Sequence, residues 1–123
     1  MTIDKLRAAT IGAKKNFKSE TIEFNGLMFE IRQPSIRARA ELTKRCTGSD
    51  GKINMFDFLV WLVIELTYEP NTDKKVFTAE DYDTLVESET GGFVDAFSEV
   101  AASLVNVDME DKKKTSSPIP KTN

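Results

Sequence analysis

The amino-acid sequence predicts a small α+β domain that is mostly helical, with an N-terminal β-hairpin and a disordered C-terminal tail. Three observations support this fold class. Two short runs of apolar residues flank Asn25-Gly26, an apolar stretch without glycine or proline fills residues 53–68, and apolar content falls sharply from Met109 onward. We therefore expect an N-terminal segment at 1–19 that is a short helix or flexible, a single domain at 20–108 and a disordered tail at 109–123.

The N-terminal third of the chain predicts a short helix followed by a hairpin. Residues 2–11 have loosely periodic apolar positions, whereas residues 21–24 and 27–32 alternate around Asn25-Gly26. The Asn-Gly pair favours a type I′ turn, which needs positive φ at both central residues. A lone hairpin is only marginally stable in water. It must therefore pack on the helices or pair with another chain.

Two helices are expected next. Ser35 is a suitable N-cap for a helix that runs to about Cys46 and is terminated by Gly48. Residues 53–68 are too long for an ordinary strand and predict a helix that Pro70 stops. Most of its surface is apolar, so it should be the central helix, covered by the other elements. It is shorter than the roughly 20 apolar residues of a membrane span.

The last ordered part predicts two further helices. Thr78-Ala79-Glu80-Asp81 is a capping-box pattern with aspartate in place of glutamate. Gly91-Gly92 then breaks the chain, and residues 93–107 carry apolar side chains at i, i+4, i+7 and i+8. This stripe is typical of an amphipathic helix packed on a core.

Composition argues against several classes of function. The net charge is −3, there is no histidine, and Cys46 is the single cysteine. An acidic chain without a basic excess is unsuited to nucleic acid, and the missing histidine removes the commonest general base and metal ligand. We expect that the protein is not an enzyme and has no catalytic residue, metal-binding residue or cofactor. We also expect no membrane association and a cytoplasmic location.

The candidate partner-binding residues lie on the predicted central helix and the helix before it. On the central helix, two aromatic residues lie beside two acids. On the preceding helix the candidates are basic. The full set is Asp57, Trp61, Glu65 and Tyr68 on the central helix and Arg37, Arg39 and Arg45 on the preceding one. Aromatic anchors beside charges fit an interaction patch, but core packing is the favoured reading of Trp61 alone. A solvated basic face is likewise favoured over a docking surface for an acidic element.

Charge is also unevenly distributed along the chain. Ten acids and no base occur between Val76 and Asp111, whereas residues 32–52 contain six bases and two acids. Such blocks could face each other within one fold, between copies or between partners, where they would orient association. The alternative is two solvated faces that confer solubility.

Several stretches of the sequence resemble the tail assembly chaperones of long-tailed bacteriophages. They are Phe24-Asn25-Gly26-Leu27 with Glu30 and Arg32-Gln33-Pro34, Asp57-Phe58-Leu59-Val60-Trp61, Thr67-Tyr68 with Pro70, Thr72-Asp73 and Val76-Phe77, and Gly91-Gly92-Phe93-Val94-Asp95 with Phe97. The resemblance covers about residues 22–107 and brings over no catalytic residue.

This resemblance implies a protein made during virion assembly in the host cell cytoplasm. Its expected partners are the tape measure protein and the tail tube protein, and self-association is left open. Such a chaperone helps tube subunits gather around the tape measure protein and leaves before the tail is complete. The alternatives are a structural tail or head-completion component that stays in the virion, and a host-side binding adaptor unrelated to phage.

Overall fold

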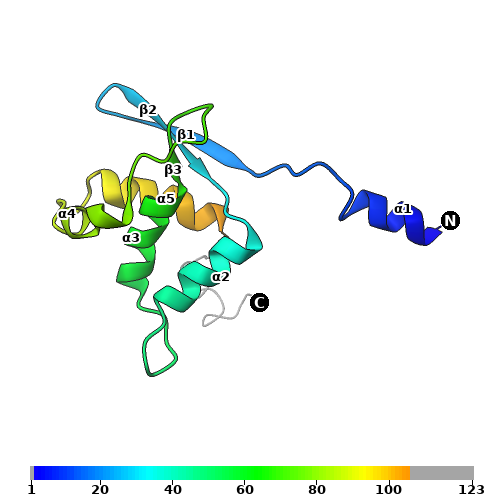
Figure 1. Ribbon diagram of the computed structural model, residues 1–123. Coiled ribbons are helices and arrows are strands. Elements are labelled where there is room, and N and C mark those ends of the chain that lie inside the picture. Colours follow the sequence, from blue (N-terminus) through cyan, green and yellow to red (C-terminus); the bar gives the residue numbers. More distant parts are fainter. Residues whose placement is uncertain (1, 106–123) are drawn as a thin grey trace, which may run out of the picture.

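A three-stranded antiparallel sheet and five helices form the fold (Figure 1). The computed structural model describes residues 2–105, and the tail predicted at 109–123 lies outside them. In chain order the elements are α1 (Thr2–Ala9), β1 (Ser19–Phe24), β2 (Leu27–Arg32), α2 (Ile36–Arg45), α3 (Met55–Leu66), β3 (Thr67–Tyr68), the 3₁₀ turn η1 (Ala79–Asp81), α4 (Tyr82–Val86) and α5 (Phe93–Leu104). The predicted α+β class is confirmed.

The hairpin forms where the sequence predicts it. Strands β1 and β2 pair from Ser19↔Arg32 to Phe24↔Leu27, and the turn residues Asn25 and Gly26 have φ values of 54° and 79°. Both central residues of the turn therefore have the positive φ that a type I′ turn requires. One face of this ribbon packs on the helices, as a lone hairpin requires.

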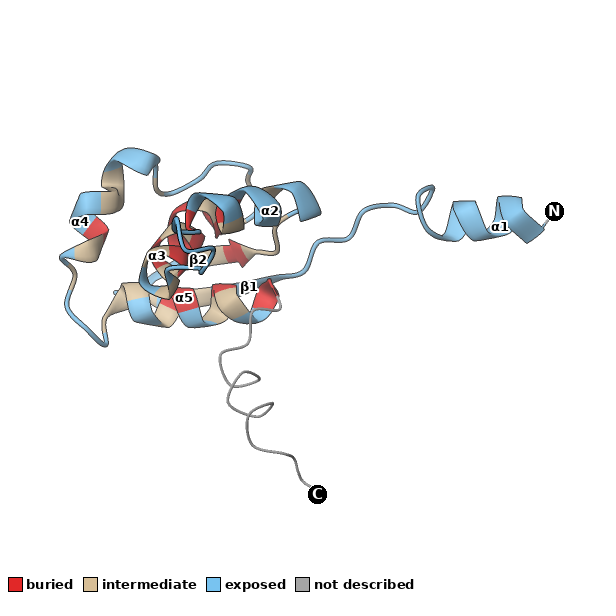
Figure 2. Ribbon diagram, turned by 90° about the horizontal axis from the view of Figure 1, so that it is seen from below, coloured by how far each residue is buried: buried red, intermediate tan, exposed pale blue. Residues whose placement is uncertain are grey.

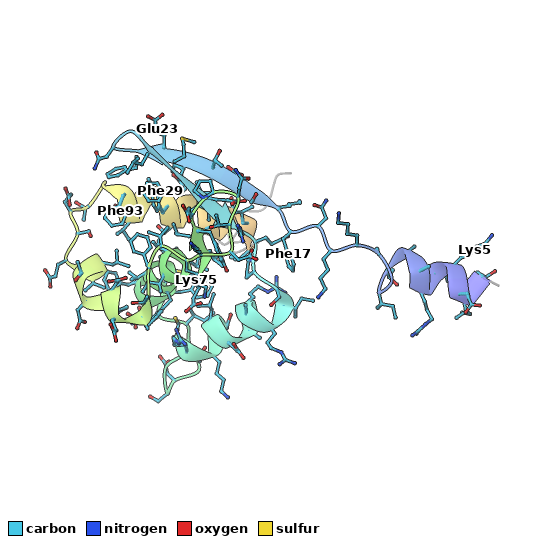
Figure 3. All side chains as sticks on the ribbon, turned by 45° about the horizontal axis from the view of Figure 1, so that its top comes forward. Lys5, Phe17, Glu23, Phe29, Lys75 and Phe93 are labelled. Atoms are coloured by element: carbon cyan, nitrogen blue, oxygen red, sulfur yellow. The ribbon has the colours of Figure 1, made fainter. Side chains whose placement is uncertain are left out.

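Phenylalanine rings join the hairpin to α5. Phe97 is fully buried and contacts Phe29 and Phe24 from the strands, with ring centroids 5.0 and 6.2 Å apart. Phe93 lies 5.6 Å from Phe97 on the same helix, and Figure 3 shows Phe29 and Phe93 between the hairpin and α5. Edge-to-face and tilted rings at these distances are favourable beyond their buried area. The sheet is thereby fixed on α5.

Helix α3 is the centre of the core, as predicted. Six of its twelve residues are buried, and it contacts α2, α4 and α5 (Figure 2). Its start is set by Asn54, whose side chain accepts a hydrogen bond from the Asp57 N–H at 3.1 Å. The wide apolar surface seen in the sequence is therefore covered on several sides by neighbouring helices.

The predicted limits of this helix were too wide at both ends. Ile53 forms a β-bridge with Thr47 before the helix begins. At the other end Thr67 and Tyr68 leave the helix and form β3, pairing with Ile31 and Glu30 of β2. A β-branched and an aromatic residue suit this extended pairing. The last helix also ends earlier than predicted, with Val105 as C-cap, and residues 106–107 lie outside the described part.

Other predicted helix signals act as expected. Ser35 caps α2 by accepting a hydrogen bond from the Ala38 N–H at 3.1 Å. Asp81 accepts one from the Thr78 N–H at 2.8 Å at the start of the η1–α4 segment. The N-terminal residues form α1, which contains no buried residue and projects from the sheet on a linker (Figures 1 and 2).

Candidate functional site

Trp61 connects three helices at the surface of the core. The half-buried indole ring stacks on Tyr82 of α4, with centroids 5.2 Å apart and planes 21° from parallel. The guanidinium of Arg45 from α2 lies 4.3 Å from the centroid of the same ring. The indole thus has protein neighbours from both adjoining helices. It is a bridge between α2, α3 and α4 that keeps some exposure.

Asp57 holds the other end of this arrangement. Its carboxylate accepts a hydrogen bond from the Tyr82 hydroxyl. That hydrogen bond, with burial and the negative charge of Asp57, raises the pKa of Tyr82 to about 12. The phenol therefore stays protonated near neutral pH and keeps donating to Asp57. Asp57 serves to fix Tyr82 against Trp61.

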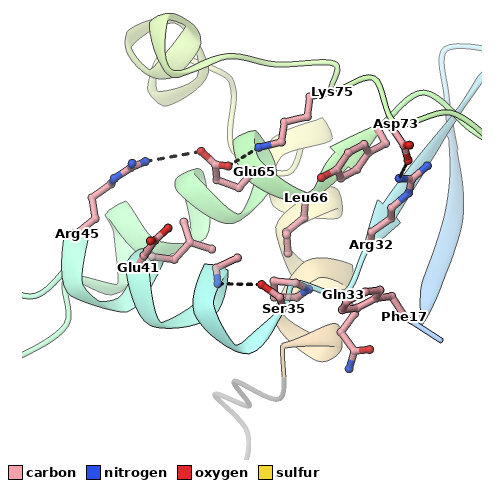
Figure 4. Close-up of a pocket in the computed structure, with 14 residues that line it drawn as sticks. Phe17, Arg32, Gln33, Ser35, Glu41, Arg45, Glu65, Leu66, Asp73 and Lys75 are labelled. Atoms are coloured by element: carbon pink, nitrogen blue, oxygen red, sulfur yellow. Dashed lines mark hydrogen bonds and ion pairs between the residues drawn. The ribbon is translucent and has the colours of Figure 1, made fainter. Parts of the chain in front are cut away.

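Glu65 joins α3 to α2 and to the loop after β3. Its carboxylate lies 2.6 Å from Lys75 Nζ and 3.7 Å from Arg45 Nη1 (Figure 4). Arg45 therefore contacts both Trp61 and Glu65, and so orders two of the predicted partner-binding residues. Because these side chains are partly exposed, each ion pair contributes little to stability alone. The ion pairs instead fix the positions of the Arg45, Glu65 and Lys75 side chains around a depression beside α2.

Tyr68 lies on β3 and not on the central helix, because the chain has turned into the sheet. The Arg32 guanidinium sits 4.1 Å from its ring centroid and forms ion pairs of 3.1 Å with Glu30 and Asp73. Burial acts to raise the pKa of Glu30. Hydrogen bonds from the Asn71 N–H and from Ser19, with the charge of Arg32, outweigh burial and hold that pKa below its usual value.

These side chains border a depression that we name the α2 groove. It consists of a cavity of about 410 Å³ and an adjoining cavity of about 220 Å³, which share Phe17, Gln33, Pro34 and Ser35. The larger cavity is bounded by α2, the end of α3, β3 and the linker before β1 (Figure 4). Its other lining residues are Arg32, Ala38, Glu41, Leu42, Arg45, Glu65, Leu66, Tyr68, Asp73 and Lys75, and those of the smaller cavity are Ile36, Arg39, Leu104 and Val105.

The predicted partner-binding residues divide into three sets around this groove. Arg45, Glu65 and Tyr68 line the larger cavity, and Arg39 lines the smaller one. Asp57 and Trp61 lie outside both cavities and reach the groove through Arg45. Arg37 is exposed on α2 and lines neither cavity. The structure thus brings four of the seven side chains to one depression.

The sequence did not point to the apolar part of the groove. Phe17 comes from the linker and is 48% exposed, although it lines both cavities. Leu42 and Leu66 contribute from α2 and α3. The phenylalanine within the basic run Lys14-Lys15-Asn16-Phe17-Lys18 was a signal that could have marked it, because an aromatic ring has a large apolar area that is favourable to bury.

The single cysteine of the chain offers no exposed thiol. Cys46 is buried, and burial, together with the charge of Asp57, raises the pKa of its thiol against the opposing effect of Arg45. Residues 2–105 contain no group of three or more potential metal ligands. Across the same residues no helix combines the length and hydrophobicity needed to cross a bilayer.

Comparison with known proteins gave one structural similarity. No protein-family model matches the chain, and no curated protein matches it. Among solved structures, the chain is similar to the tail assembly chaperone of bacteriophage HK97, with 16% sequence identity and a TM-score of 0.47. The similarity covers 86% of this chain and 96% of that one.

Proposed function

We propose that this protein is a tail assembly chaperone of a long-tailed bacteriophage. It acts in the host cytoplasm by binding the tape measure protein transiently, and it promotes assembly of the tail tube protein around that client. It performs no reaction and is absent from the mature virion. The sequence motifs suggest the family, and the α2 groove is the observation that carries the binding role.

The groove suits apolar side chains from a client helix. Its apolar surface comes from Phe17, Leu42 and Leu66. Most charged groups of the larger cavity are already paired: Glu65 contacts Arg45 and Lys75, and Arg32 contacts Asp73, whereas Glu41 belongs to no ion pair within residues 2–105. A client therefore does not need matching charges, and side chains spaced along one helix face can enter such a depression. Recognition by shape and apolarity fits a client bound at many similar segments.

The size of the groove fits reversible binding. A cavity of about 410 Å³ is at the small end of protein binding pockets. It accepts a few side chains and does not bury the large area of an obligate interface. Many copies along one client would then gain strength through multivalency while each copy remains free to leave.

Co-expression with the tape measure protein tests this function. The wild-type chain should raise the soluble fraction of the client. Ala38→Glu places a charged side chain within the groove and should abolish the gain, whereas Ala40→Glu, on the same helix but outside both cavities, should retain it. No gain with the wild-type chain, or equal effects of the two substitutions, would contradict the proposal.

The composition of purified virions separates the chaperone from its structural alternative. A chaperone that leaves before completion should be missing from the peptides of mature particles but present in infected cells. A tail or head-completion component would instead be recovered from the particles in fixed proportion to the tube subunits. Recovery from the particles would contradict the chaperone proposal and support a structural component of the virion.

A further inference from the structure

The N-terminal arm, residues 2–18, has apolar side chains on α1 and at Ile11 that no other part of the described chain covers. Ile3, Leu6 and Ile11 are 60%, 58% and 72% exposed, and α1 has no buried residue. An isolated helix of eight residues is marginal in water, because nucleation is costly and few hydrogen bonds follow. Helices this short are normally stabilised by packing. The arm therefore needs a surface to cover it.

The charge of the arm restricts which surface that is. It carries five basic residues and one acid: Lys5, Arg7, Lys14, Lys15 and Lys18 against Asp4. Helix α2 is also basic and would repel it, with Arg37, Arg39, Lys44 and Arg45 against Glu41. A covering surface of opposite charge would attract and orient the arm.

The opposite end of the domain offers such a surface. Residues 76–105 contain seven acids and no base: Glu80, Asp81, Asp83, Glu87, Glu89, Asp95 and Glu99. None of these acids belongs to an ion pair within residues 2–105. Val86 of α4 and Val94 of α5 are half-buried among them and add apolar contact area. We name this surface the acidic end.

The arm and the acidic end lie on opposite sides of the domain. Figures 1 and 2 both show α1 projecting from the start of β1, away from α4. The nine residues between α1 and β1 extend at most about 30 Å. That linker gives α1 reach beyond its own domain, toward a neighbouring molecule.

We propose that the N-terminal arm of one copy docks on the acidic end of a second copy. The apolar side of α1 packs near Val86 and Val94, and its bases face the surrounding carboxylates. The contact is heterologous: each copy presents an arm at one end and an acidic end at the other. Helix α1 lines neither cavity of the α2 groove, which the arm meets only at Phe17 near its base, so docking of α1 is tested separately from client binding.

Charge reversal with exchange tests the contact by sedimentation velocity on the full chain. The arm variant is Lys5→Glu with Arg7→Glu, and the acidic-end variant is Asp83→Lys with Glu87→Lys. Each alone should associate at least about tenfold more weakly than the wild type. An equimolar mixture of the two should recover association, because the reversed arm meets the reversed acidic end and the unreversed arm meets the unreversed acidic end.

Two matched controls separate this contact from general charge and apolar effects. Glu20→Lys with Glu23→Lys changes net charge as much as the acidic-end variant and should leave association unchanged. Leu6→Ser should weaken association, whereas Ile36→Ser, at an exposed position on α2, should not. About 1 M salt shortens the Debye length to about 3 Å and should weaken the wild-type contact.

Three results would overturn the proposal. The first is a wild-type chain that stays monomeric at low salt and high concentration. The second is a mixture of the reversed variants that does not recover association. The third is a monomeric wild-type chain whose frictional ratio changes in the arm variant while its mass does not, because that result would show that the arm docks on its own domain. None of these results bears on whether the chain solubilises its client.

Discussion

Replacing Trp61 by alanine should destabilise the protein substantially, although the ring keeps some exposure. A buried aromatic residue truncated to alanine typically costs about 3–5 kcal/mol. Trp61 stacks on Tyr82 and carries Arg45, but it is half-buried, so the lower end of that range applies. We expect a loss of about 3 kcal/mol in the free energy of unfolding. With an m-value of about 1.5 kcal/mol/M, the urea midpoint should fall by about 2 M.

The assay is urea unfolding followed by far-ultraviolet circular dichroism, because the substitution removes the only tryptophan of the chain. Phe56→Ala, on the same helix but mostly exposed, is the matched control and should change stability by less than about 0.5 kcal/mol. A double-mutant cycle with Tyr82→Ala should give a coupling of about 0.5–1.5 kcal/mol from the stacked pair.

The result that would refute this reasoning is a Trp61→Ala loss no larger than that of Phe56→Ala. The indole would then contribute nothing to the stability of the domain, and its role would have to be explained by a partner. A coupling of zero with Tyr82 would separately remove the stacking argument. Retained stability together with lost client binding would place Trp61 in the client contact itself.

Three further outcomes test the turn, the thiol and the phenol. Tyr82 should ionise near pH 12, and Asp57→Asn should lower that midpoint in an ultraviolet titration; because the folded pKa lies above the ordinary value of 10, the stabilisation is complete below about pH 10 and is lost as pH rises through about 12. Gly26→Ala should lower the free energy of unfolding by about 1–2 kcal/mol, measured by thermal melting, because φ is +79° at this position. Cys46 should react with a thiol reagent only as fast as the domain opens, and labelling at the rate of a free thiol would contradict its burial.

Elements coded by local signals were predictable from the sequence. The Asn25-Gly26 turn, the Ser35 N-cap and the apolar run of α3 each act within a few residues, so their physics can be read without the rest of the fold. Strand β3 is different. Thr67 and Tyr68 become a strand because β2 offers backbone partners, and nothing within a few residues of them specifies that pairing.

The candidate site was predictable only in part for the same reason. Aromatic and charged residues on and before the central helix predicted a partner-binding patch, and two of them, Arg45 and Glu65, line the larger cavity of the α2 groove. The apolar wall depends on tertiary structure, because Phe17 reaches the groove from a linker far away in sequence. Trp61 was ambiguous from its sequence alone, and only its stacking on Tyr82 shows how it is used in the domain.

The way charges are paired assigns different roles to the two surfaces. In the larger cavity of the α2 groove most charges are already paired, with Glu65 against Arg45 and Lys75, so a client would gain little there from new ion pairs and would contribute mainly apolar contact. At the acidic end the carboxylates form no ion pair within the described residues. Their negative potential therefore attracts a basic segment. In the two proposals, long-range attraction gathers copies of the chain, whereas short-range apolar contact selects the client. Self-association at the acidic end would be electrostatic, whereas client binding at the α2 groove would be apolar. Raising the ionic strength should therefore weaken self-association without greatly altering client binding.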